Sequence, residues 1–181
     1  MNLPNKLTVL RVILIPVFLV FMLIPNIPNN FLWAFIIFVL ASLTDTLDGY
    51  IARKYNLVTN FGKLMDPLAD KLLVMSALIC LTAQDYIPVV VTVVILSREF
   101  LVTSIRLIAA GNGTVIAADK WGKMKTASQM IWLSSLIFYL AFTSFLGNAY
   151  FLCEIMQWVA FFFTVFSGYN YIKNNINVFK D

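Results

Sequence analysis

Six long apolar runs make up most of the 181 residues of this chain and leave little room for another architecture. A helix needs about 20 predominantly apolar residues to cross about 30 Å of hydrocarbon. Hydrophobic residues form 61% of the chain and charged residues only 12%, whereas soluble domains carry about 25% charged residues. The sequence therefore predicts an all-α integral membrane protein with six transmembrane helices, near residues 7–25, 31–53, 62–83, 87–110, 126–146 and 149–172.

The connections between these runs differ in charge, which predicts the orientation of the chain. The links near 25–30, 83–87 and 146–149 contain no Lys or Arg. Ten of the thirteen basic residues lie at the N-terminus, in the links at 53–63 and 110–125, and at the C-terminus. Because an excess of Lys and Arg marks cytoplasmic loops, both termini are expected to face the cytoplasm, with the protein in the plasma membrane.

Other features of the composition narrow the class of protein. No Pro-, Ser- or Gly-rich linker divides the chain, so we expect a single membrane domain over residues 1–181. The net charge of +4 does not indicate nucleic-acid binding, because the basic residues are scattered over segment ends. The chain has no histidine, so any acid–base chemistry is left to carboxylates, Lys or Tyr.

One polar stretch, residues 45–70, carries four of the nine acidic residues. Asp45 and Asp48 lie near the cytoplasmic end of the second predicted span, and Asp66 and Asp70 near the start of the third. A carboxylate at the centre of a transmembrane helix costs on the order of 2.5–3.5 kcal/mol. Four acids in this setting therefore need a compensating partner.

Helical spacing places each pair of acids on one face of its helix, at about 100° per residue. The face of the second span also carries Gly49, Ala52 and Arg53, and the face of the third carries Gly62 and Ala69 if that helix begins early enough. Four carboxylates in one pocket cannot all stay ionised without cations. Oxygen ligands without His or Cys favour Mg²⁺ or Mn²⁺, so we expect two divalent ions, an arrangement suited to displacement at phosphorus.

The pattern Asp45-x2-Asp48-Gly49-x2-Ala52-Arg53-x8-Gly62-x3-Asp66-x3-Asp70 resembles the complete signature of the CDP-alcohol phosphatidyltransferases. The resemblance implies a transferase that moves a phosphatidyl group from a CDP-linked lipid to an alcohol and releases CMP, and it also suggests a homodimer. The four Asp would hold metal, and Asp70 would take the proton of the acceptor hydroxyl. Gly49, Ala52 and Gly62 would let the nucleotide approach the backbone, and Arg53 would pair with a phosphate.

Residues 2–18 and 97–130 are similar to one branch of this family, the phosphatidylglycerophosphate synthases of bacteria. The similarity implies CDP-diacylglycerol and sn-glycerol 3-phosphate as substrates. A phosphorylated acceptor needs further cations, and the candidates are Arg98, Arg106, Lys123 and Lys125. Ion pairs within the protein and contacts with lipid headgroups are the alternatives for these side chains. Asn5 and Thr8 either face the nucleotide or belong to an ordinary interfacial helix start.

Two alternatives to this function remain open from the sequence. Another member of the same family would use serine, inositol phosphate or a second phosphatidylglycerol as acceptor. A divalent-cation transporter would also place acids inside its spans. Arg53 and Gly62 favour the transferase, because a nucleotide phosphate needs such neighbours and a cation pathway has no evident use for them.

Overall fold

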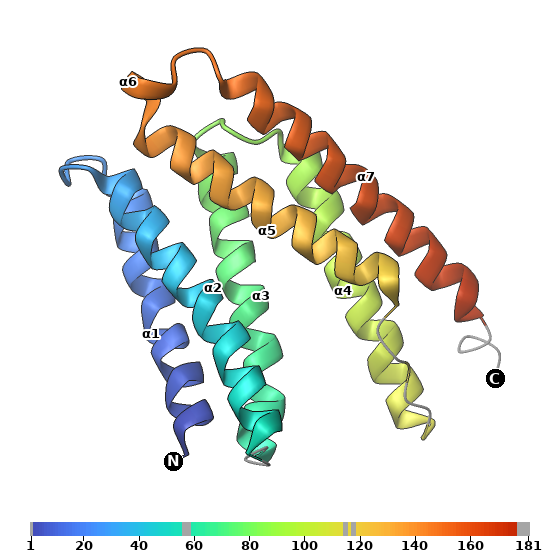
Figure 1. Ribbon diagram of the computed structural model, residues 1–181. Coiled ribbons are helices and arrows are strands. Elements are labelled where there is room, and N and C mark those ends of the chain that lie inside the picture. The colour runs from blue at the N-terminus through green and yellow to red at the C-terminus, as the bar shows by residue number, and fades with distance from the viewer. Residues whose placement is uncertain (1, 56–58, 114–115, 117–118, 177–181) are drawn as a thin grey trace.

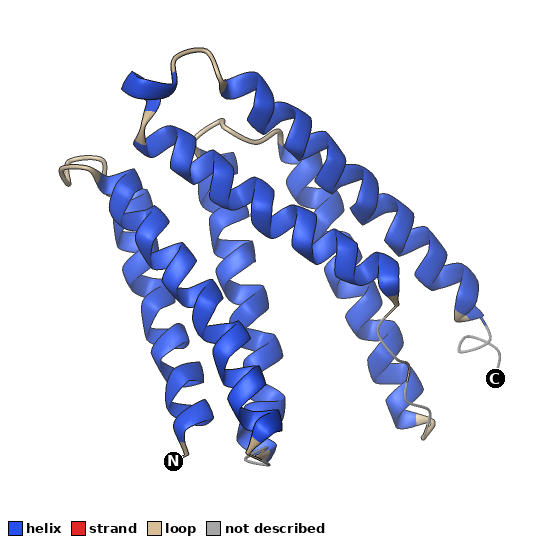
Figure 2. Ribbon diagram, viewed as in Figure 1, coloured by secondary structure: helices blue, strands red, loops and turns tan. Residues whose placement is uncertain are grey.

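The computed structural model describes residues 2–55, 59–113, 116 and 119–176, and this part of the chain is helical and contains no strand (Figures 1 and 2). The side chains of residues 45–50, 52, 53, 60, 63 and 64 lie outside the description. The helices are α1 (Leu3–Leu23), α2 (Asn30–Lys54), α3 (Asn60–Ala83), α4 (Val89–Gly111), α5 (Lys120–Ala141), α6 (Thr143–Leu146) and α7 (Tyr150–Asn174).

Each predicted apolar run coincides with one long helix, and the short α6 lies between the last two. The main difference concerns α5, which begins at Lys120 rather than at residue 126 and ends at Ala141 rather than at 146. The early start has a local cause: Asp119 is the N-cap, and its side chain accepts a hydrogen bond from the backbone N–H of Gly122 at 2.9 Å. The first turns of α5 are rich in lysine, so hydropathy alone placed the start of this helix too late.

The start of α3 decides whether its acidic residues share one helix. Thr59 caps α3, and its Oγ1 accepts a hydrogen bond from the backbone N–H of Gly62 at 3.0 Å. The helix therefore begins at Asn60 and continues through Pro67. Gly62, Ala69 and both aspartates of this segment consequently lie on one continuous helix, as their predicted common face requires.

The long helices pack in two groups that meet in the middle of the molecule (Figure 1). In one group α1 packs against α2 and α3; in the other α7 packs against α4 and α5. The two groups are joined where α5 packs on α2 and where α4 packs on α3. The shared core contains Phe18, Phe38, Leu78, Ile95 and Trp132, all at most 2% exposed.

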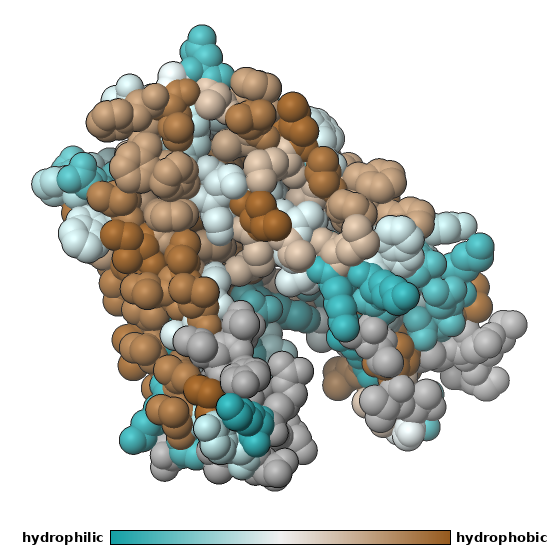
Figure 3. Space-filling view, viewed as in Figure 1, coloured by the Kyte–Doolittle hydropathy of each residue, from teal (hydrophilic) through white to brown (hydrophobic). Residues whose placement is uncertain are grey.

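Large apolar side chains also cover the outside of the bundle. Val90, Leu107 and Phe162 are among many that are more than half exposed. Figure 3 shows apolar residues over most of the visible face and hydrophilic residues at its lower end, beside a hollow. By length and composition, α1 and α7 qualify among the described helices as candidate membrane spans, and α2 contains the shorter apolar segment Asn30–Thr44. The helical fold and its apolar surface are compatible with a membrane protein. Six crossings and the cytoplasmic placement of the termini stay predictions.

Candidate active site

Of the four aspartates in the predicted motif, the structure describes the side chains of two, Asp66 and Asp70 on α3. They are four residues apart and therefore lie about one turn from each other on the same face of the helix. Both side chains are partly buried, and Ala69 between them is fully buried. The two carboxylates thus face the interior of the bundle from one helix.

The N-terminal end of α1 packs directly against this face. Thr8 Oγ1 donates a hydrogen bond to Asp66 Oδ1 at 2.5 Å, and Thr8 itself is fully buried. One turn earlier, Asn5 Oδ1 accepts a hydrogen bond from Thr59 Oγ1 at 2.8 Å. Two residues that the sequence assigned either to the nucleotide site or to a helix start therefore line the first turns of α3.

Gly62 lies at the centre of this contact. A methyl group built on it would be 3.4 Å from each of three oxygen atoms, Asn5 Oδ1, Asp66 Oδ2 and Thr59 Oγ1. Such distances are ordinary van der Waals contacts, so the fold itself tolerates a side chain here. The hydrogen atom of glycine leaves a small space ringed by oxygen atoms.

The other half of the acidic motif belongs to α2, but its side chains lie outside the described residues. These are Asp45, Asp48, Gly49, Ala52 and Arg53. Their predicted alignment with the acids of α3 stays a prediction. Among the side chains that are described, no group of three or more His, Cys, Asp or Glu lies together. Close to the motif, the fully buried Arg11 donates from Nε to the carbonyl oxygen of Ala41 on α2 at 3.2 Å.

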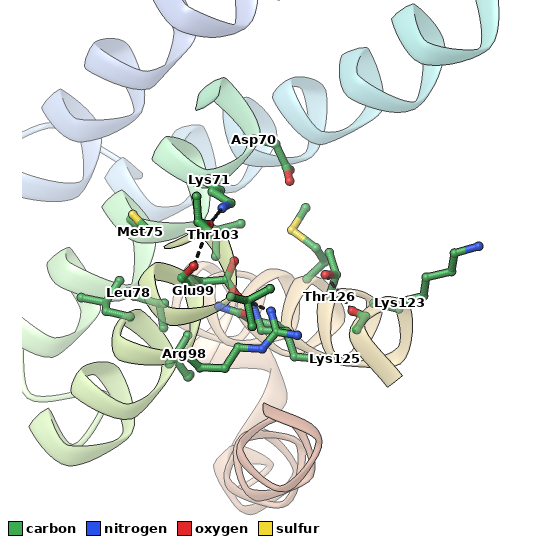
Figure 4. A pocket seen from close by; sticks show the side chains of 18 of the residues that line it. Asp70, Lys71, Met75, Leu78, Arg98, Glu99, Thr103, Lys123, Lys125 and Thr126 are labelled. Atoms are coloured by element: carbon green, nitrogen blue, oxygen red, sulfur yellow. Dashed lines mark hydrogen bonds and ion pairs between the residues drawn. The ribbon is translucent and has the colours of Figure 1, made fainter. Parts of the chain in front are cut away.

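A cavity of about 490 Å³ opens between α3, α4 and α5 (Figure 4). It has an apolar wall that includes Leu78, Ile95 and Val102. Its charged lining residues are Asp70, Lys71, Arg98, Glu99, Arg106, Lys123 and Lys125. The structure therefore brings all four predicted acceptor residues into one cavity with the predicted base, although they come from two different helices.

Two of these four cations, the buried Lys125 and the largely buried Arg98, converge on one acid. Glu99 Oε1 accepts from Arg98 Nη1 at 2.9 Å and from Lys125 Nζ at 2.6 Å. The side chains of Arg98 and Lys125 are 11% and 4% exposed. Arg98 and Lys125 therefore form ion pairs within the protein, which was the alternative to phosphate binding. Both side chains still line the cavity.

The other two cations are more exposed. Arg106 donates from Nε to the hydroxyl of Tyr171 at 3.1 Å, and its guanidinium lies 5.5 Å from the centre of the Tyr171 ring. Lys123 extends away from Arg98 and Lys125 in Figure 4. Lys71, which also lines the cavity, forms a hydrogen bond with Thr103.

Sequence reasoning missed the parts played by Glu99 and Gly168. No role in the site was predicted for Glu99, although an acid next to Arg98 inside an apolar run is a signal of a buried pair. Gly168 of α7 lies under Arg98: a methyl group built on it would be 3.1 Å from Arg98 Cγ. No sequence pattern pointed to this contact, which depends on how α7 packs on α4.

A second hollow, a groove of about 530 Å³, lies between α2 and α5. Val39, Leu43 and Ile131 form apolar parts of its wall, together with small hydroxyl residues, and Asp70 lies at its edge. Asp70 therefore borders both the charged cavity and the more apolar groove.

Residues 1–166 match the sequence model of a family described as CDP-alcohol phosphatidyltransferase. Several bacterial relatives carry the name CDP-diacylglycerol–glycerol-3-phosphate 3-phosphatidyltransferase. The protein of Bacillus subtilis is 47% identical, with 99% of this chain and 97% of the relative covered. The protein of Rickettsia typhi is 43% identical, with 95% and 96% covered, and that of Haemophilus influenzae is 34% identical, with 95% and 92% covered.

Proposed function

Because the chain belongs to the CDP-alcohol phosphatidyltransferase family, we propose that it transfers the phosphatidyl group of CDP-diacylglycerol to sn-glycerol 3-phosphate. The products are phosphatidylglycerol phosphate and CMP. The observation that carries this proposal is the cavity that sets Asp70 beside buried cations from α4 and α5. Such a cavity suits an acceptor that brings both a hydroxyl group and a phosphate.

The cavity and the relatives favour this acceptor for different reasons. Serine carries no phosphate, so it makes no use of the N–H groups that Arg98 and Lys125 keep free beside their shared contact with Glu99. Inositol phosphate carries the same charge as glycerol 3-phosphate, so the cations do not separate the two. The names of relatives that span nearly the whole chain support glycerol 3-phosphate over inositol phosphate and over phosphatidylglycerol.

Two Mg²⁺ or Mn²⁺ ions held by Asp45, Asp48, Asp66 and Asp70 belong to the proposed site. The described carboxylates fit this role: they share one face of α3 and offer only oxygen donors. Asp66 is also held by the hydroxyl of Thr8, as carboxylate ligands of metals usually are by neighbouring hydrogen bonds. When bound, such ions stabilise the charge that develops at phosphorus and lower the pKa of a bound hydroxyl.

The residues of the chain divide the remaining work. Asp70 takes the proton of the attacking hydroxyl, since it borders the cavity and no histidine is present in the sequence. Arg98 and Lys125 hold the acceptor phosphate, with Arg106 and Lys123 nearer the mouth. The groove between α2 and α5 would let an acyl chain of CDP-diacylglycerol lie beside Asp70. The phosphorus atom of the same lipid would then face the Asp70 carboxylate.

On the nucleotide side, Arg53 pairs with a phosphate of the CDP-lipid, next to Gly49 and Ala52. Asn5, Thr8 and the space above Gly62 border the same substrate from α1 and α3. The space at Gly62 supports this assignment, because the protein fold alone does not require a glycine there.

The proposed setting is a homodimer in the plasma membrane, with six spans and with both termini and the active site facing the cytoplasm. The ends of α2 and α4 and the starts of α1, α3 and α5 lie toward one end of the bundle (Figure 1). That end carries the basic residues Lys6, Lys54 and Lys120, which supports its cytoplasmic placement.

The test is a CMP-release assay with the purified protein, CDP-diacylglycerol in mixed micelles, and a panel of acceptors. We expect glycerol 3-phosphate to react fastest, ahead of serine, inositol phosphate and phosphatidylglycerol. EDTA should stop the reaction and added Mg²⁺ should restore it. Faster CMP release with another acceptor would replace the proposed substrate, and divalent-ion flux into proteoliposomes without CMP release would favour a transporter.

A further inference from the structure

We infer that Glu99 is a positioning residue, which holds Arg98 and Lys125 in place to receive the phosphate of the acceptor. The inference rests on the proposed function and deepens it, because Glu99 itself is assigned no contact with the reacting atoms. It concerns one carboxylate oxygen, Glu99 Oε1, on which both cations converge.

The ion pairs connect two helices across the cavity. Arg98 and Glu99 are neighbours on α4, whereas Lys125 lies on α5, 26 residues further along the chain. In the described part of the bundle, α4 packs against α3 and α7, and α5 packs against α2, α3, α6 and α7. The bond from Lys125 to Glu99 therefore spans from α4 to α5 at the cavity they line (Figure 4).

Glu99 also orients both cationic groups. Among the described residues it is the hydrogen-bond partner of Arg98 Nη1 and of Lys125 Nζ, and neither of these side chains makes another side-chain hydrogen bond. Arg98 Nε is buried and has no hydrogen-bond partner within the described part of the chain. The direction in which each cation points thus depends on Glu99, while several N–H groups of each stay available to a ligand.

Charge and position make opposite predictions for Glu99. The negative charge of Glu99 repels a phosphate. If Glu99 served only to neutralise the cavity, its removal would strengthen the binding of the acceptor. As a positioning group it fixes two donors from separate helices and removes their mutual repulsion before the phosphate arrives. Burying two cations side by side without an acid is costly, so loss of Glu99 would let Arg98 and Lys125 move apart.

The experiment compares the KM values of both substrates in Glu99→Gln and in the wild-type enzyme, with CMP release as the readout. We expect the KM for glycerol 3-phosphate to rise about tenfold, because both charge-assisted hydrogen bonds that orient Arg98 and Lys125 are weakened. The KM for CDP-diacylglycerol should change less than twofold. Glu154→Gln, the same change at an exposed position of α7, is the control and should match the wild type.

Glu99→Asp keeps the charge and shortens the side chain by one methylene, so it separates position from charge even if Glu99→Gln does not fold. The positioning role predicts a higher KM for glycerol 3-phosphate in this variant too. An unchanged or lower KM in either folded variant would overturn the inference. If the wild-type enzyme itself does not use glycerol 3-phosphate, the proposed function fails first, which is a distinct result.

Discussion

Thr8 on α1 and Asp66 on α3 are joined by a hydrogen bond of 2.5 Å, although 58 residues separate them in the sequence. Thr8 Oγ1 also lies 3.1 Å from the carbonyl oxygen of Pro4. The first helix of the chain thus holds a carboxylate of the acidic motif in a set orientation. The hydroxyl stabilises the fold and, if Asp66 binds metal, the metal site as well.

Replacing Thr8 with Val removes this hydroxyl while it keeps the shape of the side chain. Hydrogen bonds to charged groups contribute about 1.5–3 kcal/mol, so the thermal midpoint in detergent should fall. The Mg²⁺ concentration for half-maximal CMP release should rise about tenfold, as for other residues that support a metal ligand. Thr164→Val is the matched control: Thr164 is also fully buried, and its Oγ1 donates to the carbonyl oxygen of Ala160 at 2.7 Å, away from the acidic motif. Equal Mg²⁺ requirements in both variants would contradict a supporting role for Thr8.

Replacing Gly62 with Ala separates the needs of the fold from those of the substrate. Ala is favoured over Gly in a helix by about 0.5–1 kcal/mol, and the added methyl group would lie at contact distance from its neighbours. The thermal midpoint should therefore stay the same or rise. The KM for CDP-diacylglycerol should rise at least fivefold, because the methyl fills the space assigned to the nucleotide. Gly111→Ala, where nothing lies within 4 Å, should leave the KM unchanged; a wild-type KM for Gly62→Ala would remove that residue from the site.

Asp70→Asn tests the proposed base. The amide has nearly the same shape but cannot accept the acceptor's proton and is a weaker metal ligand, so CMP release should become undetectable. Membrane insertion and the elution volume in detergent should match the wild type. Asp85→Asn is the control, because Asp85 is exposed in the link between α3 and α4 with a positive φ of 62° that asparagine also tolerates. Turnover by the Asp70 variant would assign the proton to another group.

Arg98→Ala removes one of the two buried cations of the cavity and leaves Glu99 with Lys125 alone. Truncating one partner of a buried charge pair costs about 2–5 kcal/mol, so acceptor binding should weaken strongly. The expected result is a rise of at least tenfold in the KM for glycerol 3-phosphate and a smaller change for CDP-diacylglycerol. Equal changes for both substrates would show that Arg98 serves the whole fold rather than the acceptor.

Gly168→Ala should disturb the same cation from behind, without touching the cavity. The new methyl group would lie 3.1 Å from Arg98 Cγ, closer than most such contacts, and overpacking of this kind costs about 1–3 kcal/mol. We expect a KM for glycerol 3-phosphate between those of the wild type and Arg98→Ala, measured in the same assay. An unchanged KM would mean that Arg98 shifts without consequence for the acceptor.

Local sequence patterns were enough to predict most of the fold. Each long helix matches a run of apolar residues, and a run of about 20 such residues is long enough to cross a membrane as a helix. The common face of Asp66 and Asp70 followed from helical spacing alone. The predicted start of α5 was wrong because a single N-cap residue, Asp119, lets the helix begin within lysine-rich sequence.

The sequence by itself determined the helices, the acidic motif and the family, since each depends on residues close together in the chain. Only the tertiary structure decided which distant residues meet: Thr8 with Asp66, and Lys125 with Glu99. These contacts depend on how whole helices pack, and no spacing along the chain encodes that packing. The cavity that gathers Asp70 and the cations is therefore a property of the bundle, whereas the acidic motif that supplies Asp70 is a property of the sequence.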